Sequence, residues 1–148
     1  QLARKAIKLI KLTGANIEIL TKGGGRATAD FDLYEKGDKF GTTLTFMNYR
    51  KSEKLEANAA VPYDRIVTIK VAKEMGIKTW VSLEPIIEPK ETYELIKASQ
   101  EYTDFYKIGK LNYHKTDIDW HIVVHNIIRL MKKYNKKYYI KKDLAEYI

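Results

Sequence analysis

The stretch Thr79-Trp80-Val81-Ser82-Leu83-Glu84-Pro85-Ile86-Ile87-Glu88-Pro89 decides the fold of this 148-residue chain. Val81 and Leu83 alternate with Trp80 and Ser82. The mixture of β-branched and aromatic residues is typical of a buried strand. Pro85 has no N–H to donate, so regular strand pairing is expected to stop near Glu84. The sequence therefore predicts a strand with a carboxylate at its C-terminal end, the edge where parallel α/β sheets bind ligands.

Outward from this stretch, apolar runs with strand and helix periodicity alternate along the chain. Strands are expected at residues 16–21, 40–46, 77–83 and 105–108, with a short further strand at 138–140. Helices are expected at 2–13, 62–75, from 89 onward and at 118–134, with weaker helical character at 28–36 and 142–148. Such alternation predicts an α/β fold with a parallel sheet of βα units. The first helix follows no strand, as in a TIM-like (β/α) partial barrel that lacks its first units.

Residues between these elements predict where loops lie and where helices begin and end. Residues 23–25 are three glycines and predict a flexible loop, whereas 48–61 is polar and is expected to be irregular. Pro62 suits the first turn of a helix, and Gly76 is placed to end it. Asp117 is the expected N-terminal cap of the helix that follows it.

The composition bounds the class of protein. At 45% hydrophobic and 31% charged residues, with no apolar run of membrane-spanning length, the chain is expected to be a globular cytoplasmic protein. It contains no cysteine, which excludes disulfides, thiolate metal sites and cysteine nucleophiles from its own residues. It does not begin with methionine, so a fragment or a processed product is expected.

The positive charge is concentrated near the C-terminus. The formal net charge is +8, and residues 129–142 hold seven basic residues and no acid. We therefore predict two regions, an incomplete barrel over 1–128 and a basic C-terminal extension over 129–148. Tyrosines at 134, 138 and 139 lie among the lysines, a mixture that suits single-stranded nucleic acid. A solvated helix end would have the same composition and is the simpler interpretation.

Each of the first four strands is followed by a polar or charged group. These groups are Thr21-Lys22, Thr45 to Asn48, Glu84, and Gly109-Lys110 with Asn112. Because the carboxyl ends of parallel strands meet at one edge of a sheet, a site built there would gather these side chains. The alternative is that strand ends become polar wherever they reach water. The sequence pattern alone leaves both interpretations open.

Other polar residues have simpler explanations. Lys22 before the three glycines could cradle an anion, although the loop lacks the Walker A spacing, and a plain turn is the favoured interpretation. Arg65 is expected to form a salt bridge with Glu56 or Asp64. The histidines at 114, 121 and 125 lack the zinc-protease pattern, and no metal site is predicted from them.

Several motifs together resemble a known family. The run Ile17-Glu18-Ile19-Leu20-Thr21-Lys22 resembles the strand ending in Thr-Lys of radical SAM enzymes of the spore photoproduct lyase-like group. That group continues with a strand bearing a hydroxyl residue, an acid, and a helix that opens with Arg-Ile, and these look like Thr45, Glu56 and Arg65-Ile66. Its later motif, Gly-Ile followed by a strand and Pro-Ile-Ile-Pro, resembles residues 76–89.

The resemblance covers residues 2 to 112 and implies a barrel that binds S-adenosylmethionine and a [4Fe–4S] cluster, which cleaves the cofactor to a 5′-deoxyadenosyl radical. By analogy, Lys22 would pair with the methionine carboxylate, and Thr45 would hydrogen-bond the ribose or the methionyl part. Thr21, Glu84 and Lys110 complete the candidate cofactor contacts. Many relatives have an apolar or small residue in place of Glu84, so this acid could mark a subgroup with its own substrate.

The family's three-cysteine cluster motif has no counterpart in this chain. We therefore expect the C-terminal part of a radical SAM enzyme, without the first two βα units and inactive alone. The substrate is unknown. The alternative hypothesis is a non-catalytic nucleic-acid-binding module that uses residues 129–142, and self-association through an exposed sheet edge is also expected.

Overall fold

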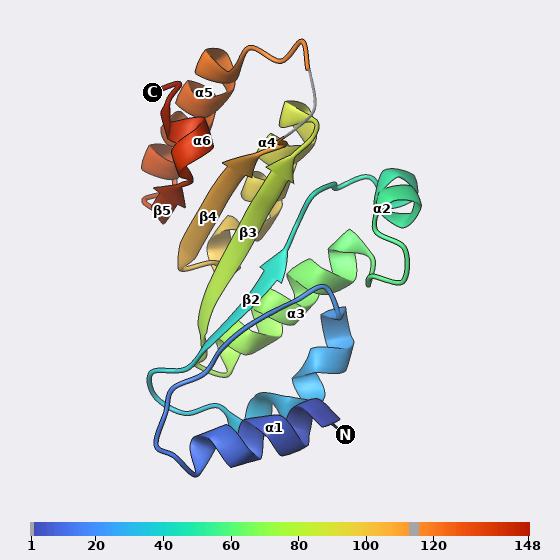
Figure 1. Ribbon diagram of the computed structural model, residues 1–148, viewed down its shortest axis with the longest axis vertical. Helices are drawn as coiled ribbons and strands as arrows, with labels where there is room; N and C mark the ends of the chain where they lie inside the picture. The colour runs from blue at the N-terminus through green and yellow to red at the C-terminus, as the bar shows by residue number, and fades with distance from the viewer. Residues whose placement is uncertain (1, 113–115) are drawn as a thin grey trace.

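The computed structural model describes residues 2–112 and 116–148 and shows an α/β fold built on one sheet (Figure 1). Its elements, in chain order, are α1 (Leu2–Lys11), β1 (Glu18–Thr21), the 3-10 helix η1 (Gly24–Leu33), β2 (Lys39–Thr43), α2 (Tyr49–Leu55), α3 (Pro62–Glu74), β3 (Lys78–Ile86), α4 (Pro89–Ser99), the 3-10 turn η2 (Gln100–Tyr102), β4 (Phe105–Lys110), α5 (Trp120–Lys133), β5 (Lys137–Ile140) and α6 (Lys142–Ala145). The predicted alternation of strands and helices is confirmed.

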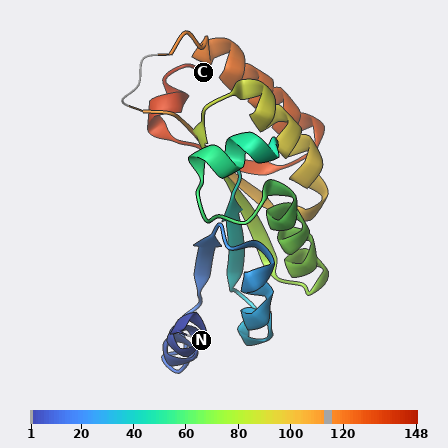
Figure 2. The same ribbon diagram turned by 90° about the vertical axis from the view of Figure 1, so that its right-hand side faces the viewer.

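The five strands lie in sequence order, β1-β2-β3-β4-β5, and every neighbouring pair is parallel. The connecting helices α3, α4 and α5 lie together on one side of the sheet (Figure 2), as expected for crossovers of one hand. An open parallel sheet with helices on one face is the arrangement of the predicted partial barrel. It places the C-terminal ends of all five strands along one edge.

The core lies between this sheet and its helices. Val81 and Leu83 of β3, Tyr106 and Ile108 of β4, and Ile69 of α3 are buried there. Because side chains alternate along a strand, Trp80, Ser82 and Glu84 of β3 belong to the other face. This alternation is the pattern on which the strand was predicted, and it assigns Glu84 to the face without the three helices.

The hydrogen-bonded ladder between β3 and β4 is interrupted next to Pro85, as the sequence predicts. The ladder with β4 is regular through Leu83, shifts register, and resumes where Ile86 pairs with Lys110. The strand therefore continues past Pro85 to Ile86, three residues beyond the predicted end at residue 83. The proline interrupts the ladder without ending the strand.

Other features of the fold also differ from the predictions, and three of them bear on the site or on a helix cap. β2 ends at Thr43 rather than residue 46, because the Thr43 carbonyl accepts a hydrogen bond from Arg65 Nη1 at 2.8 Å. The segment predicted to be irregular contains α2, capped by the Asn48 side chain, which accepts from Lys51 N at 3.1 Å. The cap of α5 is Asp119 rather than Asp117, and its carboxylate accepts from the N–H of Ile122 at 3.1 Å.

The C-terminal residues are part of the sheet architecture. The predicted boundary after residue 128 falls inside α5, β5 is hydrogen-bonded to β4, and Leu144 of α6 is buried in the core. Across 2–112 and 116–148, no helix combines the length and the apolar character needed to cross a bilayer.

Replacing Gly41 of β2 by alanine is expected to destabilise the fold by about 1–3 kcal/mol, because a Cβ there would lie 2.4 Å from Cε2 of Trp80. Chemical denaturation measures the change. In a Trp80→Leu background the same substitution should cost much less, since the indole is then gone. An equal cost in both backgrounds would show that the strain has another origin.

Candidate functional site

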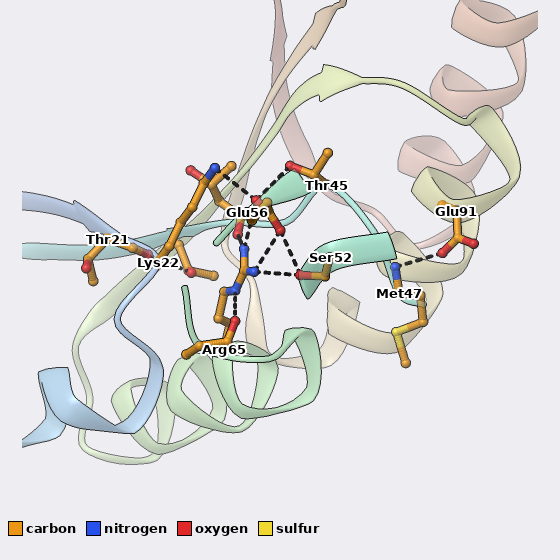
Figure 3. Close-up of polar contacts among 11 residues, drawn as sticks. Thr21, Lys22, Thr45, Met47, Ser52, Glu56, Arg65 and Glu91 are labelled. Carbon is orange, nitrogen blue, oxygen red and sulfur yellow. Dashed lines mark hydrogen bonds and ion pairs between the residues drawn. The ribbon is translucent and has the colours of Figure 1, made fainter. Parts of the chain in front are cut away.

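A buried acid and a buried base form the centre of the polar cluster at the strand ends (Figure 3). Glu56 follows α2, and Arg65 is the fourth residue of α3, with none of its surface exposed. Arg65 Nη2 donates to Glu56 Oε2 at 2.7 Å, and Nη1 donates to Oε1 at 3.2 Å. The predicted salt bridge of Arg65 is confirmed, and Glu56 is the partner. Asp64 instead accepts a hydrogen bond from Gly25 N at 3.0 Å.

The remaining donors of the guanidinium fix the segments around it. Nε donates to the Ala60 carbonyl at 2.6 Å, and Nη2 also donates to Ser52 Oγ at 3.0 Å. With the bond to the Thr43 carbonyl, Arg65 thus connects β2, α2 and the segment before α3. A planar, permanently charged group with five donors suits this position, where a lysine could not make the same set of bonds.

Lys22 and Thr45 meet on the same carboxylate. Lys22 Nζ lies 2.9 Å from Glu56 Oε1, and the Thr45 hydroxyl donates to that oxygen at 3.2 Å. Ser52 Oγ donates to Oε2 at 2.9 Å. Two residues from separate predicted strand ends are therefore brought together, and they meet through Glu56.

Thr21 has a structural position beside this cluster. Its hydroxyl accepts from Gly23 N at 3.0 Å, and its carbonyl accepts from the Thr42 hydroxyl at 2.7 Å. The N–H groups of Gly23 and Gly25 thus bind protein oxygens, which agrees with the favoured interpretation of the loop as a plain turn. Gly24 and its neighbours start η1 rather than the flexible loop that the sequence predicted.

The environment of Glu56 keeps it ionised. Burial by itself raises the pKa of this carboxyl, but the hydrogen bonds from Arg65 and Lys22 outweigh it and lower the pKa to about 2. The charges of the three side chains then sum to +1, from two cations and one anion. Arg65 is fully buried, whereas 42% of the Lys22 side chain is exposed. The uncompensated positive charge therefore reaches solvent at Lys22.

A second contact holds the segment after β2 against the start of α4 (Figure 3). Glu91 Oε2 accepts from the backbone N–H groups of Met47 at 2.8 Å and Asn48 at 2.9 Å. Lys51 Nζ also approaches Glu91 Oε1, at 3.2 Å. This anchoring fixes the backbone two residues beyond Thr45.

Glu84 and Lys110, at the ends of β3 and β4, have partners near the C-terminus. Glu84 Oε2 lies 2.6 Å from Nζ of Lys141, the residue after β5. A Cβ at position 109 would come within about 3.0 Å of the Glu84 carboxyl, so Gly109 gives that side chain its space. Lys110 Nζ lies 5.1 Å from the ring centre of Tyr147. Among the residues that the structure describes, no hydrogen bond or ion pair joins Glu84 or Lys110 to the Glu56 cluster.

Two participants were missed by the sequence analysis. Ser52 was missed because α2 was not predicted, although Asn48 is a good N-cap and was a usable signal. Lys141 was missed because its partner Glu84 is 57 positions away and no local pattern connects them.

The histidines make backbone contacts. His121 Nδ1 lies 2.9 Å from the Tyr147 carbonyl oxygen, and His125 Nδ1 lies 2.8 Å from that of His121. His114 lies outside the described residues. Within the described part of the chain, no group of three or more His, Asp or Glu side chains is placed to hold a metal ion.

No protein-family model matches the sequence, and no curated protein matches it significantly. Solved structures do match the fold. SuiB of Streptococcus suis superimposes with a TM-score of 0.74 over 93% of this chain, at 12% identity, and its complex with S-adenosylmethionine gives a TM-score of 0.73. A domain of pyruvate-formate lyase-activating enzyme from Bacteroides vulgatus ATCC 8482 matches with a TM-score of 0.66 at 15% identity, over 93% of this chain and 88% of that one.

These neighbours are radical SAM enzymes, the wider family that the sequence motifs resemble, and the α/β fold is shared with them. At identities of 12–15% the likeness concerns the fold alone. The chain spans 35% of the length of SuiB.

Proposed function

We propose that this chain forms the S-adenosylmethionine-binding part of a radical SAM enzyme. The observation that carries the proposal is the net +1 charge of the Lys22–Glu56–Arg65 cluster, exposed at Lys22 on the strand-end edge of the sheet. A carboxylate is the complementary ligand for such a site. The fold shared with SuiB, which has been crystallised with S-adenosylmethionine, adds support.

In this proposal the buried Glu56–Arg65 pair positions the Lys22 side chain, and Lys22 binds the ligand. Glu56 is held by Arg65 and Ser52, so it draws the Lys22 ammonium toward the end of β2. Thr45 is held beside it through the same carboxylate, where its hydroxyl can also accept a hydrogen bond. Lys22 would then contact the methionine carboxylate, and Thr45 the methionyl or ribose part.

The [4Fe–4S] cluster of the family has no cysteine ligands in this chain. Reductive cleavage of S-adenosylmethionine in this family uses a [4Fe–4S] cluster held by cysteine thiolates. This chain contains no cysteine, so its residues do not fit the cluster and no step that involves the cluster is assigned to them.

The finer assignment to the spore photoproduct lyase-like group rests on the motifs around Lys22, Arg65 and Pro85. Glu84 supports a subgroup-specific role, because it is held by Lys141 at the same edge and has the space that Gly109 leaves. We propose it as a contact to the ribose, the adenine or the substrate. Nucleic-acid binding through residues 129–142 and self-association through the unpaired edge of β1 remain predictions.

Replacing Lys22 by methionine tests the proposed function, since the exchange removes the ammonium and keeps most of the side-chain length. We expect S-adenosylmethionine, titrated calorimetrically, to bind the variant about 10-fold more weakly, the loss of one charged contact. 5′-Methylthioadenosine has no carboxylate, so its affinity should change little.

Lys70→Met is the matched control. Lys70 lies on α3, and its side chain is 45% exposed, close to the value for Lys22. This control should bind both ligands as the unaltered chain does. Equal binding of S-adenosylmethionine by the Lys22 and Lys70 variants, or no binding by the unaltered chain, would reject the proposal.

A further inference from the structure

A concave region lies at the edge of the sheet opposite the Glu56 cluster, where β3, β4 and β5 begin. It is a groove of about 920 Å³, within the size range of small-molecule sites. The charged residues that line it are two acids, Glu18 and Asp104, and the lysines at 39, 73, 78, 107, 136 and 137. None of them belongs to the Glu56 cluster.

The groove is strongly positive. Six lysines and two acids line it, and these formal charges sum to +4. Helices α3 and α5 end beside it, and each helix C-terminus carries roughly half a negative charge, so the two together offset only about one of the four. An excess of cations therefore remains after the ordinary role of lysines at helix ends is taken into account.

Both acids of the groove already form ion pairs with lysines of the groove. Glu18 pairs with Lys39 and with Lys107, each at 3.1 Å, and Asp104 pairs with Lys73. Within residues 2–112 and 116–148, neither Lys78 nor Lys137 forms an ion pair. These two lysines, at the first positions of β3 and β5, supply the cations that a ligand could bind.

Trp80 supplies an independent sign of a ligand. Its side chain lines the groove and the residue is only 5% exposed, yet its Nε1 has no hydrogen-bond partner among the described residues. A buried N–H is normally paired, because leaving it without an acceptor costs free energy. Lys107 Nζ already lies over the ring, 3.9 Å from its centre, so a base or another aromatic ligand cannot stack on that face of the indole.

We propose that this groove binds a small anion with two or more phosphate groups. Lys78 and Lys137 are its main cationic contacts, and Trp80 Nε1, which has less than 1 Å² of surface exposed, donates to one of its oxygens once the indole turns toward the groove. Lysine ammonium groups act on phosphate as point charges, and several oxygens allow one ligand to reach the lysines and the indole together. Because Lys107 covers the Trp80 ring, this ring does not offer the stacking surface that single-stranded nucleic acid uses.

Inorganic pyrophosphate is the probe, titrated into the unaltered chain at constant ionic strength. Saturable binding should move the indole N–H proton resonance of Trp80 downfield in NMR spectra, as expected when that group gains an acceptor. The chain has two tryptophans, and a Trp120→Phe variant identifies which resonance belongs to Trp80. Equilibrium dialysis of labelled pyrophosphate gives the affinity without any tryptophan exchange.

The double variant Lys78→Met/Lys137→Met should bind pyrophosphate at least 10-fold more weakly. Its control is Lys5→Met/Lys90→Met, which removes the same charge from exposed positions on α1 and α4. An equal loss in the control, binding that does not saturate, or an unmoved Trp80 resonance would overturn the proposal. Lys22→Met should leave pyrophosphate binding unchanged, so this test and that of the proposed function succeed or fail separately.

Discussion

Replacing Arg65 by methionine is expected to lower the free energy of unfolding by about 3–5 kcal/mol, the cost of breaking a buried ion pair from one side. Arg65 is fully buried and donates to Glu56, Ser52 and the carbonyls of Thr43 and Ala60. Its loss leaves the Glu56 carboxylate in the interior with Lys22 as its remaining cation. Urea denaturation followed by circular dichroism measures the change.

Removing the acid as well distinguishes a broken pair from lost packing. In the double variant Arg65→Met/Glu56→Gln the buried charge is gone, and we expect it to recover part of the stability that Arg65→Met loses. Lys70→Met, on the exposed side of the same helix, should change stability by less than about 0.5 kcal/mol. A loss below about 1 kcal/mol in the Arg65 single variant would contradict the central role given to this residue.

The sequence predicted those features of the fold that depend on local patterns. The alternation in residues 79–83 predicted a buried strand, and Gly76 adopts a φ of +80°, which glycine allows at a helix end. The salt bridge of Arg65 was predicted because a cation near a helix start needs a compensating acid. In each case the cause lies within about ten residues of the effect.

The features that were missed depend on contacts between distant residues. The end of β2 is set by Arg65, 22 positions beyond the Thr43 carbonyl that it binds. Lys141 and Glu84 come together because β5 joins the sheet beside β4, which brings the residue after β5 to the same edge. Sequence periodicity does not contain that information, since it describes one element at a time.

The choice between Asp117 and Asp119 shows a finer limit. Asp117 is the cap that the sequence predicts, but aspartate is a good N-cap at either position, so capping preference alone does not distinguish them. The structure selects Asp119, which makes Trp120 the first helical residue and buries it in the core. The start of α5 is therefore set by the burial of Trp120 rather than by capping preference.

Stability is expected to fall at acidic pH through Glu56 in particular. Its pKa in the folded chain is about 2, below the ordinary value of 4.5, because the hydrogen bonds from Arg65 and Lys22 outweigh the opposing effect of burial. A group with a lowered folded-state pKa stabilises the fold fully above its unfolded-state pKa, and this contribution is lost as the pH falls toward the folded-state value. The shift corresponds to about 3 kcal/mol, lost between pH 5 and pH 2.

Other carboxyls, including those of Asp38 and Asp104, also have lowered pKa values, so the pH dependence of the unaltered chain alone does not isolate Glu56. The comparison with the variant Glu56→Gln isolates the contribution of Glu56, because glutamine does not titrate. The difference in unfolding free energy between the two chains should be constant above about pH 5 and should shrink by about 3 kcal/mol on acidification to pH 2. A difference that is independent of pH would mean that Glu56 titrates alike in the folded and unfolded chains. The positioning of Lys22 by Glu56 would then be contradicted, since it requires the Glu56 carboxylate to be bonded to both cations in the folded chain.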